Sequence, residues 1–278
     1  MEESKEVRTR NNKLKLAVMI SGSGSNLQAM VDQIEAGKLD AEISLVVSNN
    51  PEAYGLIRAQ KYGISTAVVD YTSYSKRLLP KIAKKALPEE FDEVVKRQRI
   101  YSGLPHEEVR DRLARLVLAE QEIIRILEPK NPDLICLAGF MRLISPYFIG
   151  HYNREDRYGI MNIHPALLPA FPGTDGYGDT FAYGCRFGGI TVHFVDEGED
   201  TGPIIAQATY PIWPGDTVDK IRRRGMELEY ALYSQCIQWM ARGDLLVEQG
   251  EDGRPQVRIL DPEYPRFIKQ LIIRAFER

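Results

Sequence analysis

An asparagine and a histidine stand two residues apart at the end of a strand-like run, in the stretch MNIHPALLPAFPG. Alternate residues of a strand leave the same face, so Asn162 and His164 would point to the same side. The prolines that follow oppose helix or regular strand and favour a rigid turn. Asp200 lies in a short acidic loop flanked by glycines, from which a carboxylate can reach an imidazole.

These three residue types suit acyl transfer through a tetrahedral intermediate. An asparagine amide donates to a developing oxyanion, a histidine donates or shuttles a proton, and a carboxylate holds the imidazole ring. No serine or cysteine beside His164 offers a covalent nucleophile, so direct attack by an amine on an acyl donor is the simpler chemistry. His193, in TVHFVD, leaves two alternatives open: a buried structural histidine, or a metal ligand together with His164 and a carboxylate.

The glycine-rich stretch SGSGSN, residues 21–26, separates the first apolar run from the first helical pattern. At such a junction backbone N–H groups point outward and the helix dipole favours an anion. Glycines let a ligand approach the backbone, and Ser25 and Asn26 can add side-chain donors. The stretch lacks the last glycine of dinucleotide loops and the Lys-Ser/Thr pair of P-loops. It predicts a phosphate site, with a simple tight turn as the alternative.

Short apolar runs alternate with helical patterns along the first third of the chain, which predicts a parallel sheet covered on both faces. The predicted strands are residues 14–20, 41–49, 64–70, 133–140, 158–164, 188–196 and 203–212. A long amphipathic helix over 216–243 has Asp216 or Thr217 as its N-cap. A hairpin over 245–260 and a helix over 264–276 follow. The fold class is therefore α/β, doubly wound, with a mostly parallel sheet.

The alternation of strand-like and helical patterns stops between residues 75 and 115. This segment contains eleven lysines and arginines and seven acidic residues. We interpret about 76–115 as a helical insertion, either a solvated excursion that can mediate a homo-oligomer or a lid or partner-binding element. The predicted organisation is a flexible tail over 1–13, a domain over 14–245 carrying the insertion, and a C-terminal extension over 246–278.

Bulk composition excludes several classes of function. The 278 residues carry a formal net charge of −3 and a pI near 5.9, which does not favour nucleic acid or anionic membrane partners. No apolar run reaches the ~18 residues of a membrane span, and the polar N-terminus is no secretory signal. Cys136, Cys185 and Cys236 are far apart, so we expect small buried residues and a cytoplasmic protein.

Five motifs, in order and spacing, resemble the folate-dependent formyltransferases, most closely the phosphoribosylglycinamide formyltransferases of purine synthesis. They are ISGSGSNLQAM, PDLICLAGFMRLISP, MNIHPALLPAFPG, TVHFVDEGEDTGPIIAQ and GDTVDKIRRRGMELEYALY, within residues 14–75 and 116–245. The resemblance implies a Rossmann-like domain that uses 10-formyltetrahydrofolate as co-substrate and no metal. It implies that the formyl group goes to the amine of a small phosphorylated acceptor, expected to be glycinamide ribonucleotide.

The resemblance also implies a role for each matching residue. The implied catalytic group is Asn162, His164 and Asp200. The acceptor's phosphate would bind at Gly24, Ser25 and Asn26, and its ribose at Glu229. The folate site would comprise Met141, Arg142, Leu143 and Ile144, with Asp196, Glu197 and Gly198 in the loop that closes over the pteridine.

Two departures from the family pattern keep other acceptors open. After FPG this chain continues TDGYGDTFAYG in place of a histidine-containing stretch, and Met226 stands where a polar residue is common. An aminosugar nucleotide as acceptor and hydrolysis of the formyl donor are therefore alternatives. A non-enzymatic nucleotide-binding module is a third, although it has no use for Asn162, His164 and Asp200 together.

Overall fold

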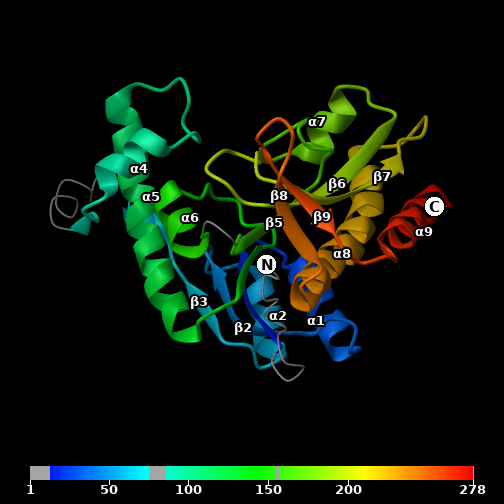
Figure 1. The fold of residues 1–278 in the computed structure, drawn as a ribbon, viewed down its shortest axis with the longest axis horizontal. Coiled ribbons are helices and arrows are strands. Elements are labelled where there is room, and N and C mark those ends of the chain that lie inside the picture. Colours follow the sequence, from blue (N-terminus) through cyan, green and yellow to red (C-terminus); the bar gives the residue numbers. More distant parts are fainter. Residues whose placement is uncertain (1–12, 75–85, 155–156, 278) are drawn as a thin grey trace, which may run out of the picture.

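The computed structural model describes residues 13–74, 86–154 and 157–277. Its centre is a seven-stranded sheet in the order β3-β2-β1-β4-β5-β6-β7 (Figure 1). The strands are β1 (Leu14–Ile20), β2 (Ala41–Ser48), β3 (Thr66–Val68), β4 (Leu134–Leu137), β5 (Ile160–His164), β6 (Phe187–Phe194) and β7 (Ile204–Pro211). The predicted strands are all present, and most end a residue or two from their predicted limits.

Helices cover both faces of the sheet, as β1 illustrates. Leu16 and Val18 pack into a core with one set of helices, whereas Ala17 and Met19 pack into a core with the other. The first set is α1 (Ser25–Glu35), α2 (Tyr54–Lys61), α8 (Val218–Arg242) and α9 (Tyr264–Phe276), and the second is α5 (His106–Leu127) and α6 (Pro146–Tyr152). The doubly wound α/β prediction is confirmed.

One strand of the sheet, β6, runs against all the others. Strands β3, β2, β1, β4 and β5 pair in parallel, while β6 lies antiparallel to both β5 and β7. In the β5–β6 register Asn162 is opposite His193, and His164 is opposite Thr191. This pairing places a second histidine beside the predicted asparagine.

Helix α8 passes behind the carboxyl end of the central strands. Thr217 caps it by accepting a hydrogen bond from the Lys220 N–H, and Gly243 ends it in the left-handed conformation at φ 75°. The buried Tyr233 hydroxyl lies 2.9 Å from the Met161 carbonyl and 3.1 Å from the Leu137 carbonyl. The helix is thereby fixed to β4 and β5, the two strands that end at the predicted site.

Helix α5 crosses the predicted end of the insertion without a break. Its second half packs Ala119 and Ile123 against the sheet, whereas its first half packs Leu113 against Val94 of α4 (Phe91–Arg97) in a small separate core. Figure 1 shows α4 beside the far end of α5, away from the sheet. Residues 75–85 of the predicted insertion lie outside the described residues, and its role in oligomer formation stays a prediction.

The remaining elements are short helices and a hairpin at the C-terminal end. They are α7 (Gly176–Ala182), the 3₁₀ turns η1 (Tyr71–Tyr74) and η2 (Glu128–Lys130), and the hairpin β8 (Leu245–Gln249) with β9 (Pro255–Ile259). Leu271 and Ala275 of α9 are buried in the main core. The predicted flexible tail falls almost entirely outside the described residues, and the division at residue 246 stays a prediction.

The sequence predicted small buried cysteines and no membrane-spanning segment. Cys136 and Cys236 are buried, Cys185 is half-buried, and all three are free thiols. In the part of the chain that the structure describes, no helix is both long and apolar enough to cross a bilayer.

Candidate active site

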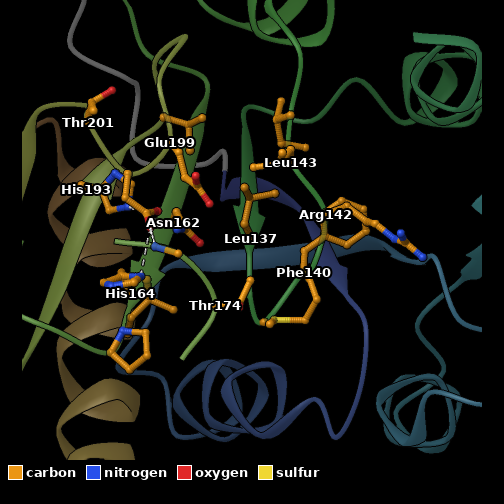
Figure 2. Close-up of a pocket in the computed structure, with 18 of the residues that line it drawn as sticks. Leu137, Phe140, Arg142, Leu143, Asn162, His164, Thr174, His193, Glu199 and Thr201 are labelled. Atoms are coloured by element: carbon orange, nitrogen blue, oxygen red, sulfur yellow. Dashed lines mark hydrogen bonds and ion pairs between the residues drawn. The ribbon is translucent and has the colours of Figure 1, made fainter. Parts of the chain in front are cut away.

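A cavity of about 390 Å³ opens at the carboxyl ends of β4 and β5. Figure 2 shows an apolar wall containing Leu137, Phe140 and Leu143 facing a polar side that contains Asn162, His164 and His193. The predicted residues in its lining are Asn26, Met141, Arg142, Leu143, Ile144, Asn162, His164, Asp196, Gly198, Asp200 and Glu229. Residues far apart in the sequence therefore meet in one cavity, and their roles in it stay a prediction.

His164 is held at both ring nitrogens. Its Nε2 lies 2.7 Å from the Phe171 carbonyl oxygen, which can only accept a hydrogen bond, so Nε2 carries a proton. Its Nδ1 lies 3.3 Å from Oδ2 of Asp200, and the two side chains are only 3% and 12% exposed. The Asp200 carboxylate therefore lies beside Nδ1, where it can orient the His164 ring.

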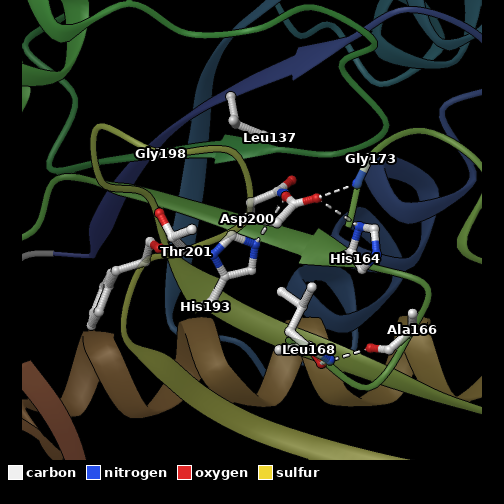
Figure 3. A network of polar contacts seen from close by, with 12 residues as sticks. Leu137, His164, Ala166, Leu168, Gly173, His193, Gly198, Asp200 and Thr201 are labelled. Carbon is white, nitrogen blue, oxygen red and sulfur yellow. Dashed lines mark hydrogen bonds and ion pairs between the residues drawn. The ribbon is translucent and has the colours of Figure 1, made fainter. Parts of the chain in front are cut away.

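The Asp200 carboxylate is also held by a backbone group and lies near a second histidine (Figure 3). The backbone N–H of Gly173 donates to Oδ2 at 2.8 Å, and Nε2 of His193 lies 3.7 Å from Oδ1. The backbone of Asp200 is itself left-handed, at φ 54°, a conformation that residues other than glycine seldom adopt. The turn after FPG and the acidic loop are thereby joined at the carboxylate.

His193 is a second buried histidine with contacts at both ring nitrogens. Its Nδ1 lies 2.8 Å from the carbonyl of Phe194 and must carry the proton, while Nε2 accepts from the Asn162 side-chain amide at 3.2 Å. Burial lowers the pKa of His193, against the opposing effect of the Asp200 charge. The ring is buried and hydrogen-bonded, which agrees with the prediction that His193 is a structural histidine. The ring also orients Asn162, which the sequence did not indicate.

Glu229 forms a second buried polar group at the floor of the cavity. Its carboxylate accepts a hydrogen bond from the Asn26 amide at 2.7 Å and another from the Tyr177 hydroxyl. Burial raises the pKa of Glu229, and these two hydrogen bonds oppose that rise. Oδ1 of Asn26 is buried without a partner among the described residues, which leaves an acceptor for a bound group.

The glycine loop meets the cavity only through Asn26. Gly24 caps α1 in a left-handed conformation, and a Cβ there would lie 2.6 Å from Cα of Gly55. Gly24 is therefore needed for the turn and for close packing against α2, whereas Ser25 is partly exposed beside it. Neither residue lines the cavity, and their predicted contact with a phosphate stays a prediction.

The loop expected to close over the pteridine is tied to the insertion. Asp196 and Gly198 line the cavity, but the Glu197 side chain turns away to form an ion pair with Arg97 of α4. Ile100, which follows α4, also lines the cavity. The described part of the insertion thus contributes to the wall of the site.

Sequence reasoning missed several groups around the cavity. Tyr177 lies on α7, a helix that was not predicted, although Asp175 before it is a typical N-cap and accepts from the Gly178 N–H at 3.2 Å. Thr174, Glu199 and Thr201 also line the cavity, and no motif singled them out. Within the described ranges, no group of three or more histidine, cysteine, aspartate or glutamate residues is arranged to hold a metal ion.

Comparison with known proteins identifies the family. The family model described as "Formyl transferase" matches residues 14–237. The Escherichia coli phosphoribosylglycinamide formyltransferase is 33% identical over 85% of this chain and 91% of its own length. The Gallus gallus trifunctional purine biosynthetic protein adenosine-3 is 36% identical over 88% of this chain, which spans 20% of that longer protein.

Solved structures agree with this assignment. The glycinamide ribonucleotide transformylase 1 of Symbiobacterium toebii superposes with a TM-score of 0.70 at 32% identity, over 94% of this chain and all of that one. Residues 14–237, matched by the family model, contain the glycine loop, the strand that ends at His164, the loop of Asp200 and most of helix α8. The chain belongs to the formyl transferase family and is a folate-dependent formyltransferase.

Proposed function

We propose that this formyltransferase moves the formyl group of 10-formyltetrahydrofolate to the primary amine of glycinamide ribonucleotide, a step of purine synthesis. The observation that carries the proposal is the meeting of Asn162, His164 and Asp200 in one cavity with the Asn26–Glu229 pair. The first set suits the reacting formyl group. The second set lies at the start of α1, where a phosphorylated acceptor can bind.

Asn162 and His164 act on the charge that develops during transfer. When the acceptor's amine nitrogen bonds to the formyl carbon, the formyl oxygen gains negative charge, which the Asn162 amide and the His164 ring stabilise. The carbon–nitrogen bond to the folate then breaks, and the proton lost by the amine balances the one gained by the folate nitrogen. Asp200 keeps the His164 ring oriented throughout, through the 3.3 Å contact.

The apolar wall fits the flat ring system of a reduced folate. Leu137 and Phe140 are buried and line the side of the cavity opposite the histidines. Ile144 is also buried and lines the cavity. Asp196 and the backbone of its loop stand at the edge, where ring nitrogens need hydrogen-bond partners. Apolar faces with a few polar groups at the rim are typical of cofactor sites.

The acceptor's phosphate would bind at the N-terminus of α1, where the first N–H groups of a helix have no partner within the helix. Ser25 lies partly exposed there and can donate to the phosphate. The unpaired Oδ1 of Asn26 is an acceptor, so it can receive a hydrogen bond from a hydroxyl or N–H group of the same substrate. Glu229, buried below, can accept hydrogen bonds from ribose hydroxyls. The free thiols are in keeping with a reducing compartment, so we place the enzyme in the cytoplasm.

The test is a transfer assay with purified protein and 10-formyltetrahydrofolate. Release of tetrahydrofolate is followed without acceptor, with glycinamide ribonucleotide and with an amino-sugar nucleotide, and the formylated product is identified by mass spectrometry. We expect release only with glycinamide ribonucleotide. Release of tetrahydrofolate together with formate, in the absence of any acceptor, would instead identify a hydrolase. Preference for the amino-sugar nucleotide would overturn the proposed acceptor.

A further inference from the structure

A second cavity, of about 690 Å³, adjoins the first one and is built largely by the insertion and η1. Its lining is Tyr71, Thr72, Tyr74, Tyr101, Glu108, Arg112, Arg115, Leu116, Met141, Arg142 and Leu143. Met141, Arg142 and Leu143 also line the cavity that contains His164. A molecule bound along the apolar wall of the first cavity can therefore continue into the second.

The second cavity carries an excess of positive charge. Arg112 is paired with Glu108 at 2.7 Å, and both side chains are partly exposed, at 43% and 36%. Nε of Arg115 donates to the Asp111 backbone carbonyl at 3.1 Å. Over the part of the chain that the structure describes, no ion pair engages Arg115 or Arg142. Three arginines and one glutamate therefore line the cavity, and Asp70 is a further acidic neighbour of Arg142, which leaves a net positive charge to bind an anion.

Aromatic side chains organise these charges. The Arg142 guanidinium lies 5.1 Å from the centre of the Tyr71 ring, and that of Arg112 lies 5.6 Å from the centre of the Tyr101 ring. Burial raises the pKa of Tyr101, while the charges of Arg112, Arg115 and Arg142 oppose that rise, so all three act on one hydroxyl. The Tyr71 hydroxyl is buried and has no partner among the described residues, which leaves a donor without an acceptor.

We propose that this arginine cavity binds the carboxylates of an oligo-γ-glutamyl tail on the folate co-substrate, beyond the first glutamate. A reduced folate ends in glutamate, and γ-linked extensions add one carboxylate per residue. The guanidinium fork matches carboxylate geometry, and the free Tyr71 hydroxyl supplies a further donor. The inference rests on the proposed function, because the tail enters from the folate side of the shared residues.

Weak contacts to the tail can raise affinity because the tail is covalently attached to a folate that is already bound. An exposed ion pair changes an equilibrium by only about two- to fivefold. A tail attached to a bound folate, however, meets the arginines at high effective concentration. Contacts to two or three carboxylates would together lower KM for the extended donor by about tenfold relative to the monoglutamyl donor. Salt screens exposed charges, so that ratio should shrink as ionic strength rises.

The experiment compares KM for mono- and tri-γ-glutamyl 10-formyltetrahydrofolate at a saturating concentration of the acceptor. In the double variant Arg112→Ala/Arg115→Ala the tenfold preference should fall to about twofold or less. Arg125→Ala is the matched control, because Arg125 is on the same helix, pairs with Glu122 and lies outside the cavity. Melting temperatures of the three proteins show whether the double variant remains folded.

A gain-of-affinity variant keeps the inference falsifiable if the double variant is unstable. Glu108→Gln removes the carboxylate that competes for Arg112, so KM for the triglutamyl donor should fall a further two- to threefold. Equal KM values for both donors in the wild type, with transfer intact, would overturn the tail site and leave the proposed function standing. Absence of transfer with either donor would overturn the proposed function itself.

Discussion

The two adjoining cavities use charge in opposite ways. In the first cavity the proposed catalytic residues His164 and Asp200 are 3% and 12% exposed, whereas Arg112 and Glu108 in the arginine cavity are 43% and 36% exposed. Water is largely absent from the first pair, so its interaction is strong and its geometry is fixed by neighbouring backbone groups. The second pair is screened. The buried edge is built for chemistry, and the arginine cavity can only adjust affinity.

The largest effect should follow from a change at the buried edge. His164→Ala removes the donor expected to stabilise the formyl oxygen, so kcat should fall about 10²-fold or more. Steady-state assays at saturating donor and acceptor measure this directly. His151→Ala, on the exposed end of α6, is the matched control and should retain full activity. A chelator should leave wild-type activity unchanged. Full activity in His164→Ala, or loss with the chelator, would contradict this assignment.

The next effect concerns Glu120, where the two regions join. Glu120 lies on α5, is fully buried, and accepts hydrogen bonds from the N–H and hydroxyl of Ser145, the N-cap of α6. Burial raises the pKa of Glu120 to about 8, against those hydrogen bonds. The folded state keeps this proton between pH ~4.5 and about 8, where the unfolded chain releases it.

The contribution of Glu120 to stability is therefore complete at low pH and is lost as pH rises through about 8. Over that window the free energy of unfolding should fall by up to about 1.4 kcal/mol per pH unit. Glu120→Gln stays neutral, so it should flatten this slope and be the more stable protein at pH 9. Urea unfolding at pH 5, 7 and 9 tests this, with the exposed Glu122→Gln as control. Parallel slopes for wild type and Glu120→Gln would refute it.

How far the sequence could predict the site depended on the range of the interactions. Asn162 and His164 were placed together because strand alternation is local. The contact between Asn162 and His193 was not predicted. It depends on β6 lying antiparallel beside β5, which no local pattern encodes. The insertion was recognised by its charge, yet its end at residue 115 falls inside α5. Local composition changed there while the helix continued, since packing on the sheet sustains its second half.

An intermediate effect should come from the glycine loop. Ser25→Ala/Asn26→Ala removes two side chains expected near the acceptor's phosphate and leaves Glu229 without one of its donors. The acceptor KM should rise about tenfold while the donor KM changes by less than twofold. Ser23→Ala is the control within the same exposed loop, where only the backbone carbonyl makes a contact, to Arg58. Equal rises in the acceptor KM and the donor KM would show that the loop is only a structural turn.

The smallest effect should arise from the ion pair that joins the insertion to the catalytic loop. Arg97 of α4 contacts Glu197, three residues before Asp200, but the two side chains are 54% and 24% exposed. Such a pair contributes about 0.2–1 kcal/mol, so Arg97→Ala should raise the donor KM about two- to threefold at low salt and less at 0.5 M salt. Lys96→Ala, its exposed neighbour paired only with Glu93, is the control.

A double-mutant cycle with Glu197→Ala separates the ion pair from the rest of the insertion. If the pair only fixes the loop, the double variant should behave like either single variant, because each change removes the same contact. Additive effects would show that Arg97 and Glu197 act independently. A fall in kcat as large as that of His164→Ala would show that the insertion positions Asp200 for chemistry, and the separation between a catalytic edge and an affinity-tuning region would then be wrong.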